Sequence, residues 1–463
     1  MTNLPSVIYD EHLPSLPVAT NAEAMCDIFQ RELPDFAEGK HQILGVAIKQ
    51  FQHRPGRKAE ALYMLHFRDA RTGAMERLIL FSMILPPDMA EAQYEAARQR
   101  HYLQPEVGPA LHFLPDLGMV LWGFPNDPKI KRLHRVVDQA SLIDILREHW
   151  DCLRVAPDYQ LHKLELEIVK YVPQDRCTFK HTLTLRKNGH AEELVLYSKI
   201  YNNKTSGEPI YDVLRALWQA PVCQAGDLMA PEPLFYDHEI NVIFQRGVPG
   251  LHAIDDLDRI DLNEVAAKSG VALAGLQQSA LPLGNFRARR GEMTEFEDGM
   301  DVLVRYEAGY RPRLEQFYEE LWERLPGLAP LETVPVHGAF RLPQLLLVEN
   351  KIALLDFDGF LAGDPIVDVS SFIAHLLYLV VKGDLTPARS REAIAHFCEA
   401  YAARAPWGLP REVLQWYVAV TLIAKQAKKC IKLVKENHAV KVEQLVGFAE
   451  AVLRGEELLV SLK

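Results

Sequence analysis

Hydrophobic residues alternate with polar ones over three stretches near the start of the chain, and this period of two predicts β-strands. The stretches are residues 43–51, 59–67 and 76–85, with turn signals between them at Pro55-Gly56 and Gly73. A helix is expected before the strands, over 21–33, and another after them, over 89–102. Two short strands, 110–113 and 119–124, complete a first β-rich segment.

A second segment repeats this order of elements. Its pattern predicts strands at 165–171, 177–185, 193–201, 234–235 and 241–244, with a helix at 209–218 between the third and fourth strands. Three anchors support a repeat: Pro55 matches Pro173 at an offset of 118 (173 − 55), Leu80 matches Leu196 at 116 (196 − 80), and Gly123 matches Gly247 at 124 (247 − 123). Drifting offsets are typical of a duplicated unit with altered hairpins. Chance similarity between two small β units is the alternative.

The rest of the chain shows mainly the helical period of 3.6 residues. Helices are predicted at 262–278, 295–306, 311–325, 365–381, 388–403, 411–433 and 440–453. The chain is therefore expected to be α+β. We predict three parts: an extra α+β unit over 1–150 that is a degenerate repeat, a β-rich region over 160–250, and a helical region over 251–463.

A segment rich in functional groups, residues 336–368, interrupts the helical region. It begins with a loop, continues as a predicted hairpin of two apolar strands, and ends in an acidic cluster. The polar residues of its loop and of its acidic cluster, in order, are His337, Arg341, Gln344, Asp356, Asp358, Asp364 and Asp368. A carboxylate at a strand end facing such a loop can hold a divalent metal ion and a phosphate.

This segment resembles the catalytic core of the aminoglycoside phosphotransferase and choline kinase-like family. The family loop reads His-Gly-Asp-x-x-x-x-Asn, and its second strand ends in Ile-Asp-Phe/Trp-Asp/Glu before Gly-Asp-Pro. The resemblance covers about 160–463 and implies a bilobal protein kinase-like fold that uses ATP and Mg²⁺. In this register Asp356, Gln344 and Asp358 are the metal ligands, and Gln344 stands where the family has Asn. Ala339 stands where the family has its catalytic Asp.

The resemblance also implies a nucleotide site in the β-rich region. Lys199, on the third strand, corresponds to the lysine that neutralises the ATP phosphates, and Glu208 or Asp212 would pair with it. Met83 occupies the matching position of the first segment, which therefore lacks this function. The remaining expected nucleotide contacts are a turn arginine and three residues between the two lobes: Arg176, Gln245, Gly247 and Val248.

The alanine at position 339 decides the functional prediction. Loss of a general base typically costs about 10²–10⁴-fold in rate. His337 is expected to brace the loop and Arg341 to hold a phosphate or an anionic substrate. We therefore predict a pseudokinase that still binds ATP and Mg²⁺. Three alternatives remain open: an active small-molecule phosphotransferase with a non-standard base, a nucleotidyl transferase, and a scaffold that binds no nucleotide.

Composition adds limits on partners. A net charge of −11 argues against general nucleic-acid binding, and the longest apolar run is too short to span a bilayer. Six scattered cysteines without metal-ligand spacing favour a cytoplasmic protein with reduced thiols. A basic stripe for an acidic partner or phosphorylated ligand is predicted from lysines at helical spacing: Lys425, Lys428, Lys429, Lys432 and Lys435.

Overall fold

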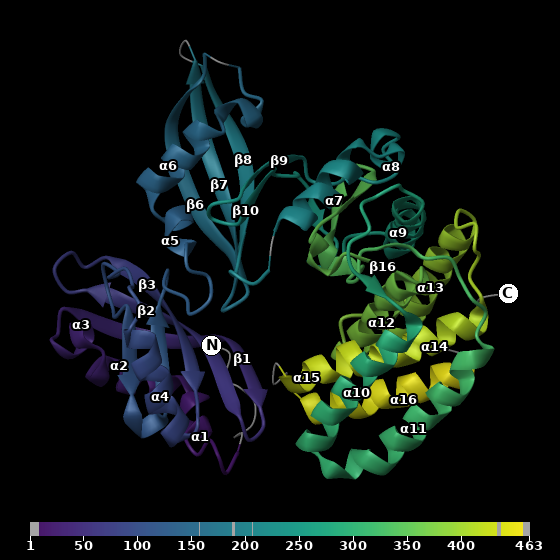
Figure 1. The fold of residues 1–463 in the computed structure, drawn as a ribbon, viewed down its shortest axis with the longest axis horizontal. Coiled ribbons are helices and arrows are strands. Elements are labelled where there is room, and N and C mark those ends of the chain that lie inside the picture. The colour runs from purple at the N-terminus through teal and green to yellow at the C-terminus, as the bar shows by residue number, and fades with distance from the viewer. Residues whose placement is uncertain (1–8, 157, 188–189, 206, 433–436, 457–463) are drawn as a thin grey trace. The chain divides into compact units, whose positions relative to one another are not determined.

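The computed structural model describes residues 9–156, 158–187, 190–205, 207–432 and 437–456 (Figure 1). The chain forms two compact units. Unit 1 comprises Met1–Gly207, Phe235–Phe244 and Lys432–Asn437, and unit 2 comprises Glu208–Leu234, Gln245–Ile431 and His438–Lys463. Each is considered on its own below. Lys435 of the predicted basic stripe lies outside the described residues.

The first sheet of unit 1 has five strands in the order β1-β2-β3-β5-β4. These are β1 (His41–Arg54), β2 (Lys58–Asp69), β3 (Met75–Ile84), β5 (Met119–Gly123) and β4 (Leu111–Leu114). Its helices are α1 (Leu16–Ala19), α2 (Ala22–Glu32), α3 (Pro34–Ala37) and α4 (Pro87–Arg98). The ring of Phe29 on α2 lies edge-on to Tyr63, with centroids 5.2 Å apart. The Tyr63 hydroxyl donates to the Ala19 carbonyl at 2.7 Å, which ties the core to α1.

The second sheet of unit 1 has the order β6-β7-β8-β10-β9. Its strands are β6 (Gln160–Val172), β7 (Arg176–Lys187), β8 (His190–Tyr201), β10 (Val242–Arg246) and β9 (Pro233–Asp237). Two helices precede it, α5 (Leu133–Val137) and α6 (Gln139–Glu148). Just after α6, His149 stacks on Phe235 of β9 with ring centroids 4.1 Å apart. The segment around α6 thus packs against the second sheet.

The two sheets share one strand order, and each follows a short helical segment, α1 to α3 before the first and α5 and α6 before the second. Asn21 caps the N-terminus of α2 and Asp138 caps that of α6, an offset of 117 (138 − 21). This value falls between the 116 and 124 of the sequence anchors. The shared order supports the internal repeat, which remains a proposal.

Asp127 joins the two sheets of unit 1. Its side chain is 6% exposed. One carboxylate oxygen accepts the N–H groups of Lys129 at 2.6 Å and Ile130 at 2.8 Å. The other accepts the Tyr171 hydroxyl at 2.6 Å and the Gln174 N–H at 2.8 Å, both from the β6–β7 hairpin. The segment after the first sheet thereby fixes the turn of the second.

Replacing Asp127 by Ala is expected to destabilise unit 1 by about 3 kcal/mol or more, because buried donors left without an acceptor cost about 1–3 kcal/mol each. Urea unfolding followed by circular dichroism measures this loss. Asp138→Ala is the matched control, since it removes an exposed carboxylate that caps a single N–H. Equal losses in the two variants would contradict the role of Asp127 as the junction.

Unit 2 is mainly helical. Its longer helices are α7 (Glu208–Gln219), α9 (Leu262–Gln277), α10 (Arg289–Tyr306), α11 (Arg311–Arg324), α12 (Ile366–Lys382), α13 (Pro387–Ala402), α14 (Arg411–Thr421) and α16 (His438–Leu453). The shorter ones are α8 (Pro221–Gln224) and α15 (Lys428–Lys432). Phe372 of α12 stacks on Phe397 of α13 with centroids 4.2 Å apart, and Phe340 packs against both. The helical core therefore reaches the loop that contains Phe340.

Two three-stranded sheets frame this loop. One has the order β11-β14-β15, with β11 (Leu251–His252), β14 (Leu345–Val348) and β15 (Lys351–Leu354). The other has the order β12-β16-β13, with β12 (Phe286–Arg287), β16 (Leu361–Gly363) and β13 (Val334–Val336). The predicted hairpin corresponds to β14 and β15, whereas the short strands β11, β12, β13 and β16 were not predicted. A strand of two or three residues is too short to show an alternating pattern in the sequence.

The predicted α+β class, with a β-rich N-terminal region and a helical C-terminal region, is confirmed. The single helix expected over 411–433 is wrong in one respect, because a π-helical segment, Leu422–Ala427, separates α14 from α15. Within the described residues, no helix combines the length and the apolarity required to cross a membrane.

Candidate functional site

The loop after β13 lies at the centre of the candidate site. β13 is buried throughout and pairs antiparallel with β16, so that Val336 faces Leu361. The chain then passes through His337 and Gly338 and enters the β14–β15 hairpin. Leu345 of β14 faces Leu354 of β15. Gln344 just before β14 and Asp356 just after β15 therefore lie close together at the open end of the hairpin.

Asp368 on α12 holds the start of the loop. Its two carboxylate oxygens accept the backbone N–H groups of His337 at 2.7 Å and Gly338 at 2.9 Å. Asp368 is fully buried, and this burial raises the pKa of its carboxyl, opposed by His337 and the two backbone N–H groups. These two hydrogen bonds fix the start of the loop to α12.

His337 is also fully buried. Its Nε2 lies 3.0 Å from the Leu355 carbonyl oxygen, just before Asp356, and its ring lies edge-on to Phe357. Burial lowers the pKa of the imidazole, partly offset by Asp368 and Asp356. A neutral imidazole bonded to a carbonyl joins the loop to the strand end, which is the bracing role expected of His337.

Gly338 makes the close approach of the loop to the acidic turn possible. Its φ is +79°, in the left-handed region, and a Cβ built there would lie 2.2 Å from the Gly359 carbonyl oxygen. Only glycine combines that backbone conformation with that space. The His-Gly pair is therefore required by the packing of residue 338 on residue 359.

Asp356 follows β15 with a φ of +67°, a conformation that Asp tolerates better than most residues. Its Oδ2 accepts the Gln344 side-chain amide at 3.3 Å. The Arg341 guanidinium is half-buried, and burial lowers its pKa while Asp356 raises it. Its Nε is buried without a hydrogen-bond partner in the described part of the chain. The structure thus brings Arg341, Gln344 and Asp356 together.

These residues fit a magnesium ion of the kind that kinase-like proteins bind. Mg²⁺ in such sites takes one or two carboxylates and completes its shell with phosphates and water. Asp356 supplies a carboxylate, and Gln344 has an amide oxygen on the group already facing it. Asp358, two residues on, has a partly buried side chain in the same turn. The described residues contain no group of three or more His, Cys, Asp or Glu side chains suited to a metal, so substrate oxygens would have to complete the shell.

Asp364 has a local partner. It forms an ion pair with Arg289 at the start of α10, and its Oδ1 accepts the Ile366 N–H at 3.0 Å. Arg289 also donates to the Ala329 carbonyl at 3.1 Å. The acidic residue after β16 therefore fixes the N-terminus of α12 and the start of α10, and the sequence did not predict the part played by Arg289.

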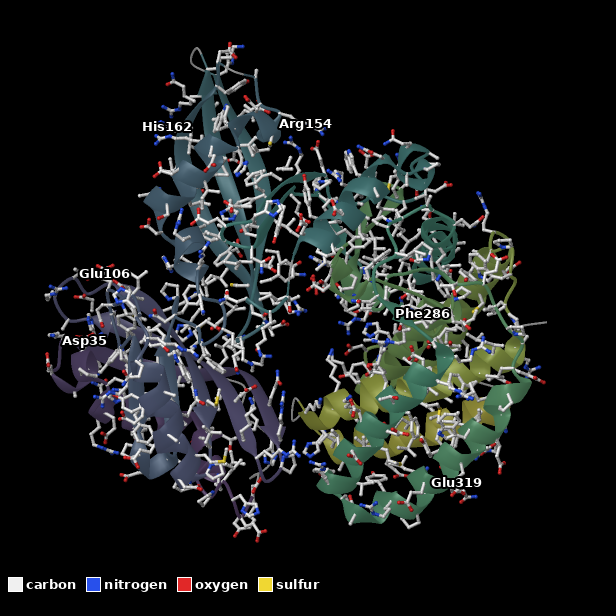
Figure 2. All side chains as sticks on the ribbon, in the orientation of Figure 1. Asp35, Glu106, Arg154, His162, Phe286 and Glu319 are labelled. Carbon is white, nitrogen blue, oxygen red and sulfur yellow. The ribbon has the colours of Figure 1, made fainter. Side chains whose placement is uncertain are left out.

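A cavity of about 460 Å³ lies beside this ion pair. Its walls combine exposed apolar groups with charged ones. Figure 2 labels one of them, Phe286, which is 64% exposed. Three arginines, Arg287, Arg289 and Arg290, and the ring of Trp322 also line it.

Lys425 corrects the prediction of a basic stripe. Its Nζ donates to the Gly338 carbonyl at 3.1 Å and to the Ser371 hydroxyl at 3.3 Å. Lys428 is largely buried and lies 3.8 Å from Asp298. A π-helical segment does not keep the 3.6-residue spacing from which the stripe was inferred. Lys425 therefore belongs to the loop site and not to an exposed stripe with Lys429 and Lys432.

Unit 1 contains two of the predicted nucleotide residues, Lys199 and Arg176. Lys199 lies on β8 opposite Thr178 of β7, on the half-exposed face of the sheet, with its ammonium 5.8 Å from the Tyr201 ring. Arg176, at the β6–β7 turn, forms an ion pair with the adjacent Asp175. Gln174 in this turn donates to Glu60 of the first sheet at 2.7 Å. The turn is thus anchored by the first segment of unit 1.

The residues expected between the lobes lie at the boundary of the units. Unit 2 resumes at Gln245, at the end of β10, and Gly247 and Val248 follow that strand. Arg246 forms an ion pair with Glu232 at 2.6 Å. Of the two predicted partners of Lys199, Asp212 bonds Arg215 on its own helix at 3.1 Å, and Glu208 lies in the first turn of α7.

Sequence reasoning missed Lys425 as a site residue and missed Glu292. Glu292, on α10, is 3% exposed, and its Oε1 has no hydrogen-bond partner in the described part of the chain. The predicted helix, 295–306, begins after Glu292, whereas α10 begins at Arg289, so the sequence pattern offered no signal for this residue.

Comparisons with known proteins agree with the motif. The model of the phosphotransferase enzyme family matches residues 189–408, which is 220 residues (408 − 189 + 1) and just under half of the chain. No curated protein matches the sequence.

Several solved structures are similar. A choline/ethanolamine kinase family protein from Mesorhizobium loti is 17% identical, covering 62% of this chain and 88% of that one at a TM-score of 0.41. An amicoumacin kinase in complex with AMP-PNP and Ca²⁺ is 12% identical, covering 70% and 96% at 0.45. An aminoglycoside phosphotransferase from Streptomyces rimosus is 14% identical, covering 67% and 98% at 0.38. The predicted resemblance is confirmed by the family match: residues 189–408 match the model of the phosphotransferase enzyme family.

Proposed function

We propose that this protein is a pseudokinase of the phosphotransferase family: it binds ATP with Mg²⁺ and acts through ligand binding rather than through efficient phosphoryl transfer. The observation that carries the proposal is Ala339 in a loop that keeps the His-Gly pair and the metal-site carboxylate Asp356, with Gln344 in place of the family's Asn. The neighbouring residues keep their supporting contacts, whereas the position of the catalytic carboxylate holds a methyl group. We further propose that residues 1–150 are a degenerate copy of the β-rich region.

The groups in unit 2 suit phosphate and metal binding. Asp356 carries the carboxylate for a divalent ion, with Gln344 as a neutral second ligand and Asp358 as a third candidate. Mg²⁺, when bound, would neutralise the charge on the nucleotide phosphates. Arg341 has a buried N–H without a partner in the described region, and burial keeps its guanidinium poorly solvated. A guanidinium in that condition gains most from an anion.

The missing base determines what the bound nucleotide can do. In phosphoryl transfer the loop carboxylate orients the acceptor hydroxyl and takes its proton. Ala339 has no group for either task. Positioning of the nucleotide therefore survives in this proposal, while activation of an acceptor does not. Lys199 in unit 1 is proposed as the residue that neutralises the nucleotide phosphates, as its strand position in the family resemblance implies.

Isothermal calorimetry with ATP and Mg²⁺ tests the proposal. The wild-type protein is expected to bind, and Asp356→Asn is expected to lower the affinity by about tenfold or more, since it removes the charged ligand. Asn tolerates the left-handed backbone at this position, so the variant isolates the charge. Glu349→Ala, exposed at the tip of the same hairpin, is the matched control and should bind like the wild type.

The same samples distinguish the alternatives. Absence of Mg-ATP binding in the wild-type protein would contradict the proposal and favour a scaffold without nucleotide. Rapid ATP consumption that Asp356→Asn abolishes would contradict the pseudokinase assignment and favour an active phosphotransferase. An AMP adduct found by mass spectrometry after incubation with Mg-ATP would favour nucleotidyl transfer.

A further inference from the structure

The ammonium of Lys425 lies directly beneath the loop position that lacks its carboxylate. It donates one hydrogen bond to the Gly338 carbonyl and one to the Ser371 hydroxyl. A lysine ammonium has three N–H donors. One donor of Lys425 therefore has no hydrogen-bond partner among the residues that the structure describes.

Simple geometry places this ammonium beside residue 339. The Gly338 carbonyl oxygen and the Cα of Ala339 belong to one peptide group, and Nζ is 3.1 Å from that oxygen. Nζ therefore lies within about 6 Å of the Ala339 Cα. Ala339 is half-exposed, whereas Phe340 next to it is fully buried in the core. Part of Ala339 is thus accessible to a ligand, unlike Phe340.

The backbone around Lys425 supports a functional role. Lys425 lies in the π-helical segment Leu422–Ala427, and π-helical turns are rare and frequent at functional sites. This segment packs against α10, where the Gly299 Cβ position is 3.0 Å from the Ala424 Cα. This close packing fixes the backbone position of Lys425, and the two hydrogen bonds of its ammonium restrict the side chain to one conformation.

The charged groups facing Lys425 come from three elements besides its own. They are Arg287 of β12, Glu292 and Glu295 of α10, and Asp368 of α12. Arg287 lies 3.7 Å from Glu292 and 3.6 Å from Glu295, which offsets the charge of both acids. Burial lowers the pKa of Lys425 and raises the pKa values of Glu292 and Asp368. Lys425 thus has no direct ion pair in the described region and can accept an external anion.

We propose that Lys425 and the open space above Ala339 form an oxyanion site, which binds a phosphate group where related enzymes hold their catalytic carboxylate. A carboxylate in this place would attract a hydroxyl hydrogen and repel phosphate. An ammonium with a spare N–H donor attracts phosphate and does not accept a hydroxyl proton. This inference deepens the proposed function, because it names the chemistry of the ligand that the loop recognises.

The phosphate can come from two sources that share this chemistry: the terminal phosphate of a nucleotide, or a phosphorylated small molecule. Inorganic phosphate is the probe for the site itself. Titration with phosphate, followed by ³¹P line broadening at constant ionic strength, gives the affinity. A parallel titration with AMP-PNP and Mg²⁺ reports whether the nucleotide competes for the same site.

Lys425→Met is expected to weaken phosphate binding by about tenfold to a hundredfold, because hydrogen bonds to charged groups contribute about 1.5–3 kcal/mol. Methionine keeps the length of the side chain, and replacing a buried charge by an apolar group is often neutral for folding. Lys428→Met is the matched control. It removes a lysine three residues on that faces Asp298, and it should bind phosphate like the wild type.

A second pair of variants tests the charge at the empty position. Ala339→Asp places a carboxylate beside the ammonium and should abolish phosphate binding. Ala339→Asn has nearly the same shape without the charge and should retain most of the binding. Equal phosphate affinity in the wild type and Lys425→Met, or equal loss in the Asp and Asn variants, would overturn the oxyanion site.

The two proposals fail in different ways. Mg-ATP binding that depends on Asp356, together with phosphate binding that ignores Lys425, would remove only the oxyanion site. Lys425-dependent phosphate binding without any Mg-ATP binding would keep the oxyanion site and remove the proposed nucleotide function. Thermal unfolding of each variant shows whether the fold is retained, and Lys425→Arg, which keeps the charge, should restore phosphate binding if Met perturbs the loop.

Discussion

Replacing Gly338 by Ala is expected to destabilise unit 2 by about 2–5 kcal/mol. The left-handed backbone costs a non-glycine residue about 1–2 kcal/mol, and overpacking adds typically about 1–3 kcal/mol. The obstacle here is the Gly359 carbonyl oxygen, 2.2 Å from the new Cβ. Because that obstacle is backbone, the acidic turn must move with it. Denaturant unfolding measures the loss of stability, and ATP titration of the folded protein measures the effect of the moved acidic turn on nucleotide binding.

Gly383 supplies the control for this result. It ends α12 with a φ of +87°, but a Cβ there would meet nothing within 4 Å. Gly383→Ala therefore carries the backbone cost alone and is expected to lose about 1–2 kcal/mol. If the two alanine variants were equally stable, the contact between residues 338 and 359 would not restrain the loop.

Acid is expected to destabilise unit 2 through His375 on α12. This side chain is 5% exposed, and neither ring nitrogen has a hydrogen-bond partner in the described residues. Burial lowers its pKa from 6.5 to about 3, and the cations Arg341, Lys429 and Lys382 add to the effect. Between pH 6.5 and 3 the unfolded chain binds a proton that the folded protein does not. Stability therefore falls as the pH decreases, by about 2 kcal/mol between pH 7 and pH 5.

His375→Leu tests the assignment. Leucine fills a similar volume and breaks no hydrogen bond that the structure records for this histidine. The variant should match or exceed the wild-type stability at pH 7 and should lose less stability on going to pH 5. An unchanged pH dependence in the variant would transfer the effect to other groups, such as His181, whose pKa burial also lowers to about 3.

Most of the regular elements could be predicted from the sequence because their hydrophobic patterns extend over many residues and turn or capping residues mark their ends. Strands of ten or more residues, such as β1 to β3, show clear alternation. The segment of α5 and α6 was missed even though Asp138 is a good N-cap and Leu142, Ile145 and Leu146 are spaced for a buried face. Its position before the second sheet, like that of α1 and α2 before the first, was the clue.

The site was predicted in part. The motif located Asp356, Gln344 and the loop, and the hairpin register brings them together. Three features could not come from the motif: the left-handed backbone at Asp356, the ion pair of Arg289 with Asp364, and the inward direction of Lys425. Each depends on residues far apart in the chain. The direction of Lys425 was misjudged because a helical wheel assumes 3.6 residues per turn throughout.

The contacts of Asp127 limit which parts of the chain can be deleted without loss of the fold. Its carboxylate belongs to the segment before the second sheet, yet it accepts the hydroxyl of Tyr171 and the backbone amide of Gln174 in the β6–β7 hairpin. Deleting residues 1–150 would therefore leave two buried donors of the second sheet without acceptors. This first segment, although it lacks the lysine, cannot be discarded as spare sequence, and during synthesis it leaves the ribosome before the strands that depend on it.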